Sequence, residues 1–366
     1  MGAVDPRVGE YARLLVERSL DVQPGWQVLI RAQPEARPLI EELIRLVAGR
    51  GAYPLLRMNF TLFPNDEPWA SEAPLELVGE IAPIDLHASD HMDARITVEA
   101  PDNTRGVAEV GAERRALMRR AAAPFFRRTM ADEIPWVGCQ YPTNAFAQEA
   151  GMPLAAFEDY FYGACLRDWD AESTAMHRLL ARFDDADQVR IVGAETDLTL
   201  SLRGRKGEVD DGRVNIPGGE FFFSPVEDSA EGTIYFDVPT ELESAPVSGI
   251  RLTFRKGRVE EASAEQGEPE LLAALDLDDG ARFVGELGIG CNAGITRPMR
   301  NILYDEKMAG TVHLAVGASY PKVGGTNVSS LHWDLIKDLR EGGRIELDGE
   351  VVQENGVWEG SEPEGV

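Results

Sequence analysis

Three carboxylates in the second half of the chain stand where a metal ion or a ligand could approach the backbone closely. Glu220 ends the run PGGE at 217–220, and Glu286 lies in GELGIG at 285–290. Glu306 comes just before a stretch rich in β-branched residues. Glycine has no side chain, so it lets the backbone approach a bound group, and carboxylate oxygens are ligands for divalent cations. These three positions are candidate metal ligands.

Two histidines, an aspartate and a tyrosine complete the candidate set. His332 and Asp334 are separated by one residue, so on a strand their side chains share a face and can converge on one ion. On a helix they would point about 200° apart, which makes a strand the required conformation. His313 precedes them, and Tyr320 follows His313 by seven residues. Oxygen and imidazole donors suit Zn²⁺, Co²⁺ or Mn²⁺.

Each of these signals is weak alone, and other interpretations stay open. His313 could be a hydrogen-bonded core histidine, and Glu220 and Glu286 could cap a helix or a turn. A second group of potential ligands lies at 85–93, where His87 and His91 are four residues apart. We expect a strand end there, so this spacing would not align the two rings. His177 is expected to have a structural role. The sequence contains no G-x-S-x-G elbow, so a serine nucleophile is not supported. No G-x-G-x-x-G turn follows the first expected strand, so a dinucleotide site is not supported either.

The first half of the chain predicts alternating helices and strands. Asp5 and Pro6 begin a helix whose apolar face includes Tyr11 and Leu15. Helix-length segments between strands indicate βαβ units and a mainly parallel sheet. The expected strands are 26–31, 53–58, 84–87, 95–99 and 136–139, and the expected helices after the first are 39–47, 106–131 and 154–184.

The second half predicts short strands separated by glycine turns, which indicates antiparallel pairing. The expected strands are 189–192, 198–202, 233–238, 250–254 and 312–316. The predicted fold is therefore an N-terminal α/β domain (1–186) with a mainly parallel sheet, and a C-terminal α+β domain (187–358) rich in antiparallel strands that carries the metal site. Residues 359–366 are expected to form an acidic tail.

The charge of the chain excludes several classes of function. Among 366 residues, 63 Asp and Glu oppose 36 Lys and Arg, a net charge of −27. Such a surface repels phosphate backbones and anionic lipids, so we expect neither nucleic-acid nor membrane binding. Many acids with only five lysines predict a halophilic protein. The start of the chain does not resemble a signal peptide, and the three cysteines form no metal motif, so a cytoplasmic protein with free thiols is expected.

Together these motifs resemble the aminopeptidase T/aminopeptidase S family of metallopeptidases. The resemblance rests on VNIPGGE at 214–220, SPVEDSAEG at 224–232, GELG at 285–288, DEK at 305–307, His313, ASYP at 318–321 and HWD at 332–334. It extends more diffusely to YPT at 141–143. The order of these motifs is kept from residue 5 to about 355, so the resemblance covers nearly the whole chain.

The resemblance implies a homodimeric exopeptidase that uses two divalent metal ions, Zn, Co or Mn, on peptides with a free N-terminus. The implied metal ligands are Glu220, Glu286, Glu306, His313, Tyr320, His332 and Asp334, with Glu286 as the bridge. Glu220 or Glu286 would act as the base, and Tyr320 would bind a metal or stabilise the oxyanion.

The same fold family also includes an iron-dependent dioxygenase that cleaves dihydroxypyridine rings. This alternative needs a single Fe(II), which His313, His332 and Asp334 could hold as a facial triad. The retained Glu220 and Glu286 favour the two-metal peptidase.

Overall fold

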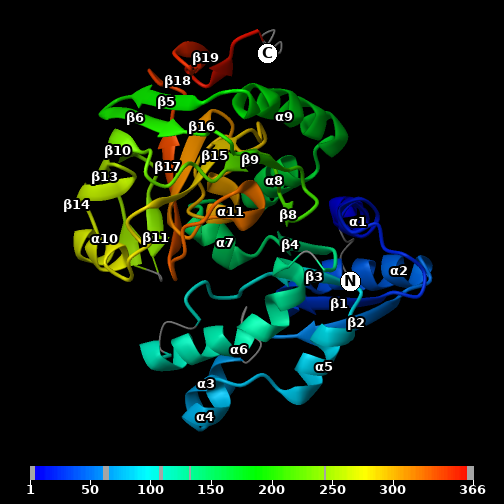
Figure 1. Cartoon of the computed structure of the whole chain (residues 1–366). Helices are drawn as coiled ribbons and strands as arrows, with labels where there is room; N and C mark the ends of the chain where they lie inside the picture. Colours follow the sequence, from blue (N-terminus) through cyan, green and yellow to red (C-terminus); the bar gives the residue numbers. More distant parts are fainter. Residues whose placement is uncertain (1–4, 61–65, 107–109, 132, 243–244, 361–366) are drawn as a thin grey trace. The chain divides into compact units, whose positions relative to one another are not determined.

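The computed structural model describes residues 5–60, 66–106, 110–131, 133–242 and 245–360 (Figure 1). The chain forms two compact units. The first comprises Met1–Leu166 and Gly212–Pro217, and the second comprises Arg167–Asp211 and Gly218–Val366. This division differs from a single boundary at 186/187, because the helix at 169–184 belongs to the second unit. The chain start at 1–4 and most of the expected acidic tail (361–366) lie outside the described residues.

A five-stranded parallel sheet forms the centre of the first unit, as the alternating pattern predicted. Its order is β2 (Tyr53–Met58), β1 (Gln27–Ala32), β3 (Ala94–Glu99), β4 (Trp136–Gln140) and β8 (Asn215–Ile216). Five of the six β1 residues are buried, as is usual for the interior of a parallel sheet. The outer strand β2 is mostly exposed.

The helices of this unit begin where the sequence supplies helix-starting residues. Asp5 accepts a hydrogen bond from the Arg7 amide and caps α1. The helices are α1 (Pro6–Arg13), a π-helical turn (Leu14–Ser19), a short 3₁₀ turn (Pro34–Ala36), α2 (Arg37–Gly49), α3 (Glu67–Glu72), α4 (Leu75–Val78), α5 (Pro83–His91), α6 (Ala112–Met130), α7 (Asn144–Glu149) and α8 (Leu154–Cys165).

Two expectations about local structure are wrong. The strand expected at 84–87 is part of helix α5, because Pro83 fits the first turn of a helix and Ile84 is exposed rather than directed into a sheet. The single helix expected at 154–184 is two helices, α8 and α9 (Trp169–Asp184), and Asp168 caps the second. The helix expected at 106–131 begins at Ala112, and residues 107–109 lie outside the described part.

Antiparallel sheets build the second unit, which confirms the predicted change of architecture. The five-stranded sheet has the order β17 (His332–Asp338), β16 (Thr311–Gly317), β15 (Val284–Gly290), β9 (Glu220–Phe223) and β7 (Glu208–Asp210). The eight-stranded sheet has the order β14 (Arg258–Ser263), β13 (Ile250–Arg255), β10 (Glu231–Phe236), β6 (Thr196–Ser201), β5 (Gln188–Gly193), β18 (Arg344–Leu347), β19 (Glu350–Glu354) and β20 (Val357–Trp358). The unit also contains the pair β11 (Thr240–Leu242) and β12 (Ala245–Val247), helices α9, α10 (Glu268–Leu275) and α11 (Ile302–Asp305), and a 3₁₀ turn (Pro321–Val323).

The central strands of the five-stranded sheet of the second unit are buried on both faces. Side chains alternate along each strand, and one set, including Phe221, Leu287, Leu314 and Leu335, enters the large hydrophobic core. Every residue of β15 and β16 is buried, so the opposite face is also covered at its centre, whereas His332 and Asp334 on the neighbouring strand β17 stay partly open to solvent. That opposite face carries five of the seven candidate metal ligands: Glu220, Glu286, His313, His332 and Asp334.

No helix in the described part of the chain has both the length and the apolar character needed to cross a membrane. All three cysteines are free thiols, and Cys139 and Cys165 are buried.

Candidate metal centre

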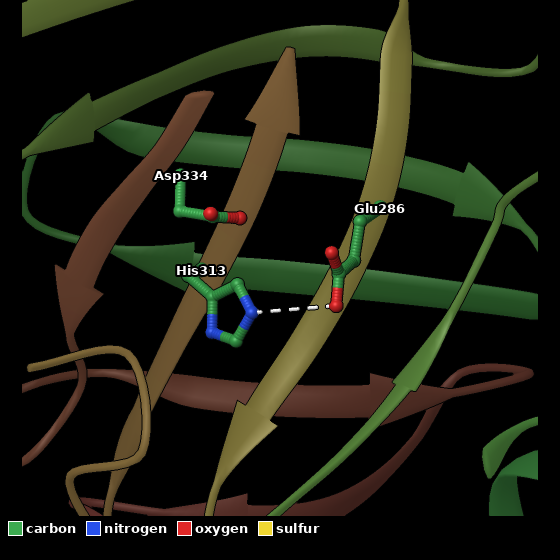
Figure 2. A group of neighbouring side chains, drawn as sticks. All are labelled: Glu286, His313 and Asp334. Atoms are coloured by element: carbon green, nitrogen blue, oxygen red, sulfur yellow. Dashed lines mark ion pairs between the residues drawn. The ribbon is translucent and has the colours of Figure 1, made fainter. Parts of the chain in front are cut away.

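Three neighbouring strands bring a glutamate, a histidine and an aspartate to one point. The register places Glu286 on β15 and Asp334 on β17 opposite the same residue of β16, Ala315. Because Ala315 has only a methyl group, the two carboxylates can lean towards each other over it. His313 lies two residues earlier on the same face of β16 (Figure 2). One ligand atom from each of Glu286, His313 and Asp334 lies within 4.8 Å of the others.

Glycines on this face make room for the histidine ring. Gly288 is the register partner of His313, and a β-carbon at Gly288 would lie 2.0 Å from Cε1 of that ring. Gly290 is the register partner of Glu220, and Gly317 is the partner of His332. Gly288, one of the glycines near Glu286 in the sequence, therefore leaves the space that the imidazole of His313 fills.

The carboxylate of Glu286 lies between the two histidines. Its Oε1 atom is 3.6 Å from Nε2 of His313, and its Oε2 atom is 3.3 Å from Nε2 of His332. Nε2 of His313 is also 3.4 Å from Oε2 of Glu220, and Nε2 of His332 is 3.7 Å from Oδ1 of Asp334. Each imidazole therefore faces two carboxylates, and the two share Glu286.

A backbone carbonyl fixes the orientation of each imidazole. Nδ1 of His313 donates to the Glu306 carbonyl at 3.1 Å, and Nδ1 of His332 donates to the Ala318 carbonyl at 2.9 Å. A carbonyl oxygen only accepts, so Nδ1 carries a proton in both rings. Nε2 of each ring is left facing the carboxylates, which is the arrangement found in histidines that bind metals.

The donor set fits cations. In a neutral imidazole with a proton on Nδ1, Nε2 presents a lone pair, and lone pairs repel the carboxylate oxygens that they face. A proton or a metal ion between them removes this repulsion. In addition, Oε2 of Glu220 and Oδ1 of Asp334 are buried and accept no hydrogen bond from the described residues. Unpaired buried carboxylate oxygens are costly, and a bound cation would satisfy both.

The carboxylates change the protonation of the histidines. Burial alone would lower the pKa of His313, but Glu286 and Glu220 outweigh it and raise this pKa to about 10. In the same way, Glu286 and Asp334 raise the pKa of His332 to about 9 against the effect of burial. Burial opposes ionisation of Glu286, yet the two histidines lower its pKa to about 2. The excess negative charge thus holds protons on the imidazoles where no metal ion is bound.

Tyr320 lies at the same site. Its hydroxyl is 3.3 Å from Nε2 of His332, and its ring packs on Phe222. The Tyr320 amide donates to the hydroxyl of Ser224, which in turn donates to the Gly285 carbonyl. Burial and the nearby carboxylates raise the pKa of Tyr320 well above its usual value, so the phenol keeps its proton and can donate a hydrogen bond.

A buried lysine, which the sequence analysis did not single out, stands behind Glu220. The side chain of Lys307 is fully buried, and its Nζ atom is 2.9 Å from Oε1 of Glu220 and 3.8 Å from Oδ2 of Asp210. It also pairs with the Glu306 carboxylate. The sequence signal was present: Lys307 is one of only five lysines, and it follows directly after a candidate ligand.

Glu306 differs from the other expected ligands. It pairs with Lys307, and its carbonyl, rather than its carboxylate, orients His313. Burial raises the pKa of the Glu306 carboxyl group to about 8; Lys307 opposes this rise, and Glu220 and Asp334 add to it.

The second group of potential ligands lies on helix α5 and not at a strand end. His87 and His91 share a helix face after all, and their exposed rings stack with centroids 4.1 Å apart. The argument that their spacing would not align them is therefore wrong. His177 is exposed on α9, where its Nδ1 atom contacts the Ser173 carbonyl at 2.8 Å.

The comparisons with known proteins place the chain in one family. The model of the thermophilic metalloprotease family M29 matches residues 4–358. The chain therefore belongs to this family, and the expected class of enzyme, a metalloaminopeptidase, is confirmed. The expected resemblance to aminopeptidases T and S is confirmed as well, since relatives carry those names.

Two relatives are similar over most of their length. Aminopeptidase 2 of Geobacillus stearothermophilus is 26% identical over 88% of this chain and 86% of the relative. Aminopeptidase T of Thermus aquaticus is 25% identical over 87% of this chain and 86% of the relative.

Two solved structures share the fold. Aminopeptidase AmpT of Thermus thermophilus has a TM-score of 0.85 at 22% identity, covering 98% of this chain and 100% of that one. This likeness confirms the predicted fold class. The 2,5-dihydroxypyridine dioxygenase of Pseudomonas putida has a TM-score of 0.60 at 13% identity, covering 98% and 99%.

Removing the buried lysine should destabilise the metal-free protein strongly. Lys307→Met leaves Glu220 and Glu306 without their buried cation, and breaking such a pair costs roughly 3–5 kcal/mol. Lys337→Met is the matched control, because Lys337 is also buried but its carboxylate partner Asp237 is partly exposed and can be hydrated. Denaturant unfolding in the presence of a chelator measures both variants. Equal losses of stability would contradict the view that Lys307 neutralises a buried acidic cluster.

Proposed function

We propose that the protein removes N-terminal residues from peptides and that it does so with two divalent metal ions. The observation that carries this proposal is the position of Glu286, whose two oxygens face two different imidazoles. A carboxylate placed in this way is suited to bridge two ions. Zn²⁺, Co²⁺ and Mn²⁺ all accept such mixed nitrogen and oxygen ligands.

The side chains divide into two groups around Glu286. Glu220 and His313 would hold one ion, and His332 and Asp334 would hold the other. Tyr320 would lie beside the second group. We assign Glu306 a supporting position rather than a ligand role, because its carboxylate pairs with Lys307.

The chain's own residues can perform the proton transfers of peptide hydrolysis. Two divalent ions, when bound, lower the pKa of a water molecule and polarise the scissile carbonyl. Glu220 or Glu286 would accept the proton of that water and return it to the departing amine. Tyr320, which stays protonated, would donate a hydrogen bond to the oxyanion. The excess of carboxylates would attract the charged amine of the substrate, which explains a preference for chain ends.

A single-iron dioxygenase is the weaker alternative. It requires His313, His332 and Asp334 around one ion with open positions, but Glu286 stands between the two histidines. Four carboxylates, on Glu220, Glu286, Glu306 and Asp334, share the site with one lysine. A single iron held by His313, His332 and Asp334 leaves Glu220 and Glu286 without a role, although Glu220 also lies 3.4 Å from Nε2 of His313.

Turnover of matched substrates tests the proposed activity. The protein is stripped with a chelator, reloaded with Co²⁺, Zn²⁺, Mn²⁺ or Fe²⁺ in high salt, and given an aminoacyl anilide. The control substrate is the same anilide with an acetylated amine. We expect hydrolysis of the free amine only, because acetylation removes the positive charge. Consumption of 2,5-dihydroxypyridine with oxygen, without any anilide hydrolysis, would favour the dioxygenase instead.

Replacing the central carboxylate should lower the number of bound ions. Glu286→Gln keeps the shape of the side chain but removes its charge, so we expect loss of at least one ion per chain and a fall in activity larger than the roughly 10–100-fold that loss of a group behind a metal ligand causes. Metal analysis after dialysis measures the ion content. His87→Gln removes an exposed histidine outside the site and should change neither quantity. Full metal content in Glu286→Gln would refute the bridging role.

The homodimer, the cytoplasmic location and the salt adaptation expected from the sequence remain predictions.

A further inference from the structure

Strand β2, at one edge of the parallel sheet, exposes an unusual amount of apolar surface. Tyr53 is 64% exposed and Phe60, just beyond the strand, is 69% exposed. Between them, Leu55, Leu56 and Met58 are each at least one third exposed. Side chains on both faces of the strand are therefore open to solvent, although three of them are large aliphatic groups.

The inner side of β2 is hydrogen-bonded to β1. The Tyr53 amide donates to the Trp26 carbonyl, and the Asn59 amide donates to the Ala32 carbonyl. Backbone groups alternate sides along a strand with a period of two residues. The odd-numbered residues of β2 therefore face β1, and the even-numbered residues direct their backbone groups away from the sheet.

The outer side of β2 offers a row of backbone groups. It consists of the amides of Leu56 and Met58 and the carbonyls of Pro54, Leu56 and Met58. No strand of the described chain pairs with this side. Proline at an edge position is tolerated because its missing amide would point away from the sheet. An exposed apolar edge of this kind promotes association unless a partner covers it.

The charge around β2 makes contact between two copies feasible. The chain carries −27 charges, so two copies repel each other over most of their surface. Between Glu42 and Asp66, however, there is no acidic residue. The strand itself carries one charged residue, Arg57, which pairs with Asp85 of the same unit at 3.1 Å. Strand β2 itself therefore adds no negative charge to the repulsion between two copies.

We propose that β2 pairs antiparallel with β2 of a second copy of this chain, with Leu56 facing Leu56 across a two-fold axis. In this register each Leu56 amide donates to the opposite Leu56 carbonyl, and each Met58 amide donates to the opposite Pro54 carbonyl. These four bonds use only residues of β2, and the missing Pro54 amide removes only the two bonds to the Met58 carbonyls. The two five-stranded sheets become one continuous sheet.

The side chains that β2 would bring together by pairing with itself favour a second copy of the chain over a different partner. Self-pairing about Leu56 brings apolar side chains together, with Pro54 opposite Met58 and leucine opposite leucine. A two-fold arrangement is also the commonest assembly of soluble proteins. This inference specifies the surface of the expected homodimer and uses no residue of the metal centre, so the failure of either proposal leaves the other standing.

Disulfide formation tests the register directly. Residues that form a hydrogen-bonded antiparallel pair have Cα atoms about 5.5 Å apart, within the range that a disulfide spans. Leu56→Cys should therefore give covalent dimers under mild oxidation. Leu55→Cys is the matched control, because in this register it faces Arg57 and lies about 7–8 Å from its own symmetry mate. The unmodified chain, with its three native cysteines, is oxidised in parallel and should stay uncross-linked.

Light scattering in high salt provides the second measurement. The unmodified chain should have twice the mass of one copy, and Leu56→Asp, which sets two carboxylates face to face, should shift it to the mass of one copy. Leu277→Asp, at an exposed leucine of the second unit, should not. A monomeric unmodified chain, a dimer that survives Leu56→Asp, or cross-linking by Leu55→Cys in place of Leu56→Cys would each overturn the proposal.

Discussion

The crowding of carboxylates on one buried face of a β-sheet is the constraint on which this structure depends. Glu220, Glu286 and Asp334 lie within reach of two imidazoles whose Nδ1 atoms are already bound to backbone carbonyls. A face of this kind is stable only when positive charge is supplied to it. Lys307 supplies one charge from behind Glu220. Protons on the histidines or metal ions must supply the rest.

The five-stranded sheet of the second unit meets this constraint because its two faces have different roles. One face of the five-stranded sheet packs into the hydrophobic core and fixes the strand positions. The other face carries small residues between the candidate ligands, and these leave space in which the ligand side chains of adjacent strands can meet. Ala315 between Glu286 and Asp334, and Gly288 beneath His313, show this most directly. Larger residues at these two positions would fill the space in which the ligands meet.

Much of this arrangement could be predicted from the sequence, and the failures have physical causes. The strand period alone places His332 and Asp334 on one face, and their spacing is local. The contact of Glu286 with both histidines depends on the register between strands, which no local pattern encodes. Lys307 was overlooked because a lysine beside a glutamate usually forms a solvated pair. The expectation of a strand at 84–87, within helix α5, fails because a short apolar run does not distinguish a strand from a helix.

The number and position of bound cations test this account most directly. Crystals soaked in Co²⁺ and measured at the cobalt absorption edge would show each ion as an anomalous peak. We predict two peaks per chain, one beside Glu220 and His313 and one beside His332 and Asp334, with Glu286 contacting both. A single peak at full occupancy, surrounded by His313, His332 and Asp334 alone, would contradict the two-ion centre.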